Sequence, residues 1–167
     1  KGINLIFELA KLDPGNDYFI YGGLNNQISK LKLKNTMKNL FLFPHQNYRR
    51  INKYLLKMDI LLIPYTNKVT AAGNVSNIAQ YTSPLKLFDY MSAGKLIISS
   101  ELDVLKEILT DRYNCLFVKN YLNPHAWIMT IKKIKLNMVM RQIVSKNSFK
   151  KVKEFHHEKR TKKYLEI

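Results

Sequence analysis

Short apolar runs of strand length alternate along this chain with longer stretches of helical periodicity. The run at 60–64 is almost continuously apolar, which is typical of a strand buried on both faces of a parallel sheet. Strands are predicted at 18–21, 40–43, 60–64, 96–98 and 115–118. Helices are predicted at 2–12, 24–38, 47–57, 84–93, 103–109 and 124–136, and through most of 137–167. On these elements, Leu56 and Phe41 are among the side chains expected to face the core. This order predicts an α/β domain with one doubly wound, mostly parallel sheet.

The size and composition of the chain fit one globular domain with its own core. It has 167 residues, of which 46% are hydrophobic, and no apolar run is long enough to span a bilayer. Cys115 is the sole cysteine, so the chain has no internal disulfide and no cluster of cysteine ligands for a metal. A reducing, cytoplasmic location is therefore expected.

The formal net charge of +16 has several interpretations. Lysines crowd the segments 30–38 and 132–163, where they are expected to be solvated on exposed helix faces. The same charge favours attraction to an anionic membrane or to anionic substrates. Nucleic-acid binding is less well supported, because the sequence has no zinc-ligand spacing, RNA-binding aromatic motif or helix-turn-helix signature.

The segment 83–100 is the most informative part of the sequence. Ser83 is a good N-cap and Pro84 suits the first helical position, so a helix is expected to begin there. Gly94 stands where a left-handed C-cap is needed, and a short apolar strand follows it. The backbone N–H groups at the beginning of this helix favour a phosphate, and the carboxylate of Asp89 lies within two turns of them. These features together indicate a pocket for a nucleoside diphosphate.

The long irregular stretch 65–82 connects the strand at 60–64 to this helix. In open α/β sheets, ligands bind beyond the carboxyl ends of the strands, where such a connection lies. A loop of this length in a compact domain is more often functional than not. We therefore expect the binding pocket at this end of the sheet.

Four segments resemble those of a known family. They are Lys1–Gly2 before an amphipathic helix, an aspartate followed by an apolar strand ending in proline at 59–64, the block 83–108, and Phe-His-His-Glu-Lys-Arg at 155–160. In this order they resemble the C-terminal, donor-binding domain of retaining GT-B glycosyltransferases, the glycosyl transferases group 1 family. The resemblance implies a Rossmann-like fold, the C-terminal half of a GT-B fold. It also implies a first strand ahead of Lys1.

The resemblance assigns roles to residues at the diphosphate end of the pocket. Lys1 would neutralise the pyrophosphate of the donor, although it is otherwise simply an exposed lysine. Ser83, the backbone N–H groups of Leu85 and Lys86, and the side chain of Lys86 would also bind the diphosphate, with a solvated role for Lys86 equally open. Asp89 matches a family glutamate that accepts hydrogen bonds from the ribose.

The sugar end of the pocket departs from the family pattern. Tyr81 stands where the family has a glutamate that contacts the donor sugar, and Thr82 offers a hydroxyl beside it. His45 follows a strand end near the expected position of the base, whereas the other three histidines are interpreted as structural or solvated. No residue of this chain is assigned a catalytic role. No metal or other cofactor is expected, because a lysine and a helix N-terminus would replace the cation.

The resulting hypothesis is a retaining hexosyltransferase that moves a sugar from a nucleotide-diphosphate sugar to a glycan, lipid-linked or polysaccharide acceptor. Residues 1–154 would form the donor-binding domain, and the helix at 155–167 would pack toward an N-terminal acceptor domain outside this chain. Isolated, that helix would expose apolar residues such as Phe155, Tyr164 and Leu165, which would favour association. We expect a cytoplasmic protein, peripheral at the inner membrane face, that is inactive as this chain alone. The alternatives are a non-catalytic nucleotide-binding module and, less favoured, a basic nucleic-acid-binding α/β domain.

Overall fold

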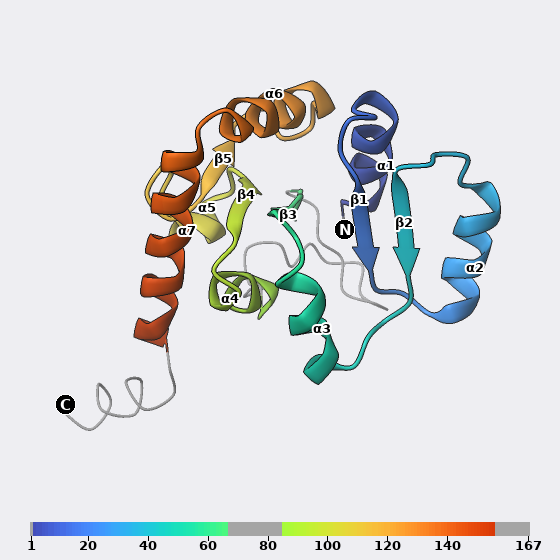
Figure 1. Cartoon of the computed structure of the whole chain (residues 1–167), viewed down its shortest axis with the longest axis horizontal. Coiled ribbons are helices and arrows are strands. Elements are labelled where there is room, and N and C mark those ends of the chain that lie inside the picture. The colour runs from blue at the N-terminus through green and yellow to red at the C-terminus, as the bar shows by residue number, and fades with distance from the viewer. Residues whose placement is uncertain (1, 67–84, 156–167) are drawn as a thin grey trace.

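Strands and helices alternate in the structure, a computed structural model that describes residues 2–66 and 85–155 (Figure 1). The strands are β1 (Tyr18–Tyr21), β2 (Leu40–Phe43), β3 (Ile60–Ile63), β4 (Leu96–Ser100) and β5 (Leu116–Val118). The helices are α1 (Ile3–Leu12), α2 (Asn25–Lys34), α3 (Tyr48–Leu55), α4 (Leu85–Ser92), α5 (Asp103–Lys106), α6 (Pro124–Lys135) and α7 (Met138–Val152), with a 3-10 turn, η1, at Lys153–Phe155. The predicted order of elements is confirmed for these residues.

The strands pair in parallel, as predicted, but they form two sheets. β1 pairs with β2, and β3, β4 and β5 form a second sheet with β4 in the middle. As described, β1 and β3 do not pair with each other, so the single continuous sheet of the sequence prediction is divided between them.

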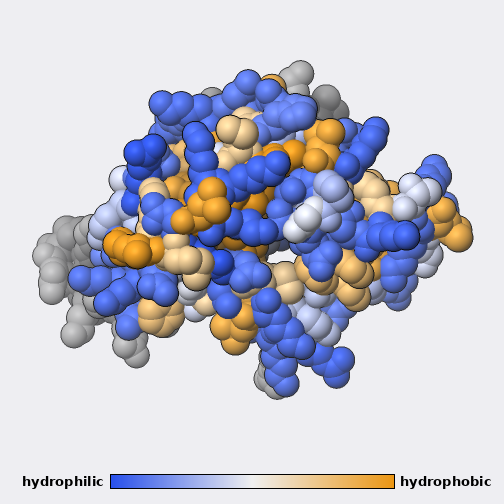
Figure 2. Space-filling view, turned by 45° about the horizontal axis from the view of Figure 1, so that its top comes forward, coloured by the Kyte–Doolittle hydropathy of each residue, from blue (hydrophilic) through white to orange (hydrophobic). Residues whose placement is uncertain are grey.

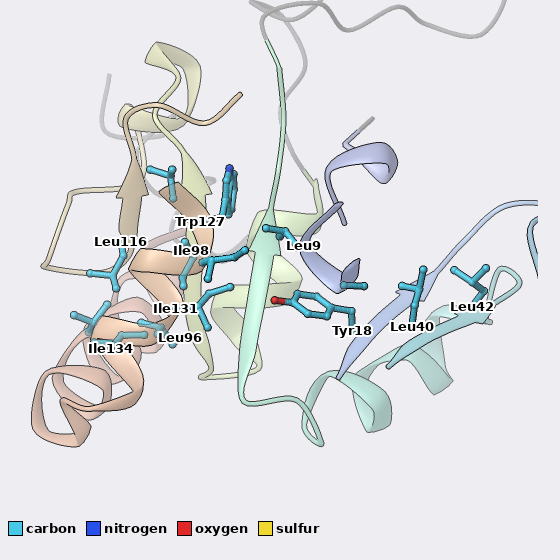
Figure 3. Packing of buried hydrophobic residues seen from close by; sticks show 14 of the residues in the cluster. Leu9, Tyr18, Leu40, Leu42, Leu96, Ile98, Leu116, Trp127, Ile131 and Ile134 are labelled. Carbon is cyan, nitrogen blue, oxygen red and sulfur yellow. The ribbon is translucent and has the colours of Figure 1, made fainter. Parts of the chain in front are cut away.

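One hydrophobic core nevertheless joins both sheets (Figure 3). α1 and α6 supply Leu9 and Trp127, both fully buried, and these pack in a cluster with side chains from β1, β2, β4 and β5. The Nε1–H of Trp127 donates a hydrogen bond to the carbonyl oxygen of Tyr121 at 2.9 Å, so the indole is both buried and satisfied. This shared core makes the two sheets parts of one domain.

A second cluster covers the other face of β4. Ile97 points into it between Leu96 and Ile98, which face the first core, and all three are fully buried. α4 and α7 provide much of the remaining packing, through residues such as Met91 and Val152. A strand buried on both faces is what a doubly wound parallel sheet requires. Cys115 is a buried free thiol in this cluster, and burial raises its pKa.

Two positions expected to face inward are exposed instead. Leu56 is 57% exposed because α3 ends at Leu55, so Leu56 lies beyond the packed face of the helix. Phe41 is exposed because Leu40 and Leu42 take the inner face of β2, and side chains alternate along a strand. Phe41 stacks instead on Phe19 of β1, with ring centroids 4.9 Å apart.

The lysine-rich segments lie on the surface, as predicted, wherever the structure describes them. Exposed lysines include Lys30, Lys32 and Lys34 on α2, and Lys132, Lys133 and Lys135 on α6. Phe155, expected to be exposed, is half-buried because its ring packs against that of Phe88 at a centroid distance of 5.3 Å. Within residues 2–66 and 85–155, no helix has both the length and the apolar character needed to cross a bilayer.

Candidate functional site

The carboxyl ends of β3 and β4 are tied together by the side chain of Ser100. Ser100 is fully buried, and its Oγ donates a hydrogen bond to the carbonyl oxygen of Tyr65 at 2.6 Å. This bond links the last residue of β4 to the chain that leaves β3, and so fixes the path on which that chain enters the segment 67–84. We call this end of the three-stranded sheet the carboxyl edge, defined by Ile63, Pro64, Tyr65 and Ser100.

Gly2 lies against the same edge. Its φ is +68°, in the left-handed region that favours glycine, and a Cβ at this position would overlap the carbonyl oxygen of Pro64 and lie 2.6 Å from its Cγ. The beginning of α1 is therefore packed directly on the end of β3. Lys1, the predicted diphosphate ligand that precedes Gly2, lies outside the described residues.

α4 leads away from the predicted phosphate-binding position. Of the residues predicted to form this position, Leu85 and Lys86 are among those that the structure describes. α4 is described from Leu85 onward, and the predicted N-cap Ser83 lies outside the described residues, as do Tyr81 and Thr82. The end of the helix matches its prediction, since Gly94 has a φ of +64° and its N–H donates to the carbonyl oxygen of Met91 at 3.1 Å. Lys86, in the first turn, is exposed.

Asp89 is half-buried on α4 between two fully buried residues, Leu87 and Met91. Its neighbour Tyr90 is also half-buried, and its pKa is raised to about 12, mainly by burial, with smaller contributions from Tyr65 and Asp89. The Tyr90 hydroxyl therefore stays protonated at neutral pH and can donate a hydrogen bond. The placement fits the expectation of a carboxylate on a largely packed helix, while its role at a ribose stays a prediction.

His45 lies at the carboxyl end of the other sheet. Its backbone N–H donates to the carbonyl oxygen of Gly23 at 3.0 Å, and the Gly22 N–H donates to Phe43 at 3.0 Å. Gly23 has a φ of +82°, so the turn after β1 uses the conformational freedom of glycine. The His45 side chain is exposed beside this turn. A contact between His45 and a base or sugar stays a prediction.

The sequence prediction missed Ser100 as a residue that shapes the site. The available signal was a pair of serines, Ser99 and Ser100, at the end of an apolar strand, where a buried hydroxyl needs a partner. In the part of the chain that the structure describes, no three His, Cys, Asp or Glu side chains group as metal ligands. The expectation that no metal is needed stays a prediction.

Comparison with known proteins gives the family and the fold. The family model described as "Glycosyl transferases group 1" matches residues 1–151, whereas no curated protein matches the chain. Sucrose-phosphate synthase from Thermosynechococcus elongatus has a similar structure, with a TM-score of 0.72 at 15% identity, covering 92% of this chain and 37% of that one. HepE from Anabaena in complex with UDP-glucose has a TM-score of 0.67 at 12% identity, covering 92% and 41%.

A third similar structure is itself a domain. It is the C-terminal domain of the group 1 glycosyl transferase LpcC from Francisella tularensis, with a TM-score of 0.65 at 15% identity, covering 92% of this chain and 78% of that one. By contrast, this chain spans about two fifths of HepE. These likenesses confirm the predicted fold, a parallel α/β half of a GT-B structure. Because the family model extends over residues 1–151, the chain belongs to the glycosyl transferases group 1 family.

Proposed function

We propose that this chain is the donor-binding domain of a retaining glycosyltransferase that uses a nucleotide-diphosphate sugar. The observation that carries the proposal is membership of the group 1 family over residues 1–151. The whole protein would transfer a hexose to a glycan, lipid-linked or polysaccharide acceptor. The acceptor would be held by an N-terminal domain, toward which the helix at 155–167 would pack, and this chain alone would be inactive.

The carboxyl edge is where the donor diphosphate would bind. Gly2 packs on Pro64 there, which supports a place for the adjacent Lys1 at this edge. The N–H groups at the beginning of α4, including that of Leu85, would meet the phosphates together with Ser83 and Lys86. Positive charge at this position would stabilise the diphosphate as the glycosidic bond breaks, so no metal would be required.

The nucleoside would extend from the diphosphate toward α4 and β2. Asp89 would accept hydrogen bonds from the ribose hydroxyls, and its half-buried position on α4, the helix that begins near the proposed diphosphate position, supports this role. His45, Tyr81 and Thr82 would contact the base or the sugar. HepE, which has a similar fold, was solved with UDP-glucose, and uridine is therefore the first base to test.

Binding of UDP, GDP and ADP to the chain, measured by isothermal titration calorimetry, tests this proposal. We expect one nucleotide to bind and Asp89→Ala to weaken that binding at least tenfold, because hydrogen bonds to a charged acceptor are lost. Asp59→Ala is the matched control, since Asp59 is an exposed carboxylate before β3, at the opposite end of that strand from the carboxyl edge. The ribose assignment is wrong if no nucleotide binds or if Asp89→Ala binds as tightly as the wild type.

One observation favours a second function, a nucleotide-binding module without transferase activity. Tyr81 occupies the position of the family's sugar-contacting glutamate, so a carboxylate is missing from the sugar end. Transfer of labelled sugar by the whole protein distinguishes the two functions. A protein that binds the nucleotide but neither transfers nor hydrolyses the donor would be such a module.

A further inference from the structure

α6 and α7 meet at a corner whose apolar side chains are exposed. Leu136 is 89% exposed, and Met138, Val139 and Ile143 are each more than half exposed. We call these four residues the apolar corner. Single exposed apolar residues are common, but four within eight consecutive positions on one helix–helix junction form a cluster that needs an explanation.

Positive charge surrounds the apolar corner. Residues 119–153 include nine lysines and arginines and no aspartate or glutamate. Lys132, Lys133 and Lys146 are exposed on the same two helices. Figure 2, in which the α6 side of Figure 1 is turned toward the viewer, shows orange hydrophobic patches among the blue hydrophilic surface. An apolar cluster within a basic field fits a partner with an apolar interior and an anionic surface.

A groove of about 350 Å³ opens beside the first turns of α7. Its lining is Asp59, Gly94, Lys95, Leu96, Arg141, Gln142, Ser145 and Lys146. Asp59, the acidic residue of this lining, pairs with Arg141 at 2.7 Å, so its charge is compensated. Lys95 and Lys146 then make the groove net positive, and the Ser145 hydroxyl adds a donor. The groove has the charge and hydrogen-bonding groups to hold a phosphate.

The groove lies at the amino ends of β3 and β4. Asp59 directly precedes β3, and Lys95 directly precedes β4. The carboxyl edge, where the donor would bind, is at the other end of these strands. The groove and the apolar corner share α7, because Lys146 and Gln142 line the groove while Val139 and Ile143 belong to the corner. On α7 their residues are neighbours three positions apart, and both lie away from the carboxyl edge.

We propose that the apolar corner and the basic groove together dock on an anionic phospholipid bilayer. The apolar side chains enter the boundary between headgroups and acyl chains, and the groove holds the phosphate of a lipid headgroup. The surrounding lysines attract the negative surface of the membrane. This binding does not depend on sugar transfer, so it goes beyond the function proposed above.

Vesicle flotation of the 167-residue chain tests this inference. We expect strong binding to vesicles that contain phosphatidylglycerol, weak binding to phosphatidylcholine alone, and a steep loss of binding at high salt. Lys95→Ala/Lys146→Ala is expected to lower the partition coefficient about fivefold for each lysine removed. Val139→Ser/Ile143→Ser, which keeps every charge, is expected to lower it about tenfold because apolar burial in the membrane is lost.

The matched control is Lys30→Ala/Leu33→Ser on α2. This pair also removes an exposed lysine and an apolar side chain that is 87% exposed, but it lies on another helix, and we expect no change in binding. Near-UV circular dichroism of each variant establishes that the fold is retained. Equal binding to both kinds of vesicle, or equal loss in the α2 control, would overturn the proposal. So would concentration-dependent dimers that Val139→Ser/Ile143→Ser dissolves, because the corner would then be a self-association surface.

Discussion

Replacing Ser100 with alanine tests how the carboxyl edge is held. The Ser100 hydroxyl is fully buried and its hydrogen bond to the Tyr65 carbonyl oxygen is short, at 2.6 Å. Alanine removes the hydroxyl donor, so the Tyr65 carbonyl oxygen loses the hydrogen bond from Ser100. Loss of a buried hydrogen-bond partner costs about 1–3 kcal/mol. Because only one oxygen atom is removed, the cavity term is small. We therefore expect Ser100→Ala to lower the free energy of unfolding by about 2 kcal/mol.

Urea denaturation of the chain, followed by circular dichroism, measures this loss. With a slope of about 2 kcal/mol per molar urea, the midpoint should fall by about 1 M. Ser99→Ala is the matched control, since Ser99 is equally buried but its Oγ donates to the carbonyl oxygen of the next residue, at 3.2 Å. That bond connects no separate segments, so we expect a loss below about 1 kcal/mol. The reasoning is refuted if the two variants lose the same stability.

Three further predictions concern stability. Gly2→Ala should lower the free energy of unfolding by at least about 2 kcal/mol, because alanine is unfavourable in the left-handed conformation and its Cβ would overlap Pro64. Gly15→Ala is the control and should not lower the free energy of unfolding in this way, because its Cβ would meet nothing within 4 Å. Trp127→Phe should lower the Tm by about 5–10 °C in calorimetry, because a buried hydrogen bond and packing volume are lost together. Burial raises the pKa of Tyr90 to about 12, so the unfolded chain releases this proton first and stability should fall as pH rises from about 10 to about 12. Tyr90→Phe should reduce this pH-dependent loss of stability, measured by urea denaturation at several pH values over the same range. An unchanged pH dependence of the free energy of unfolding would contradict the assignment of the raised pKa to Tyr90.

The fold was predictable because its signals are local. Each short apolar run became a strand, and Gly94 alone was enough to predict the left-handed end of α4. The errors at Leu56 and Phe41 arose where a helix end or the alternation of a strand decides which side of an element faces the core. An apolar residue type does not carry that information.

The site was less predictable because it depends on contacts between distant segments. The Ser100–Tyr65 hydrogen bond joins residues 35 positions apart, and the Asp59–Arg141 ion pair joins residues 82 apart. Both follow from the register of packed elements, which no local pattern encodes. The predicted diphosphate and ribose residues came from a family resemblance, and among them Asp89 and Lys86 are the ones with described side chains.

The two proposed surfaces lie at opposite ends of the same strands, and this separation can itself be tested. Lys95, which precedes β4, and Ser100, its last residue, are five residues apart along an extended strand, or about 16 Å, which exceeds the Debye length of about 8 Å at physiological ionic strength. Neutralising Lys95 and Lys146 in the groove should therefore change the affinity for a nucleoside diphosphate by less than about twofold, while membrane binding falls. Calorimetry and flotation on the same double variant measure both quantities. A loss of nucleotide affinity as large as the loss of membrane binding would mean that the groove belongs to the donor site, and the assignment of separate ends would be wrong.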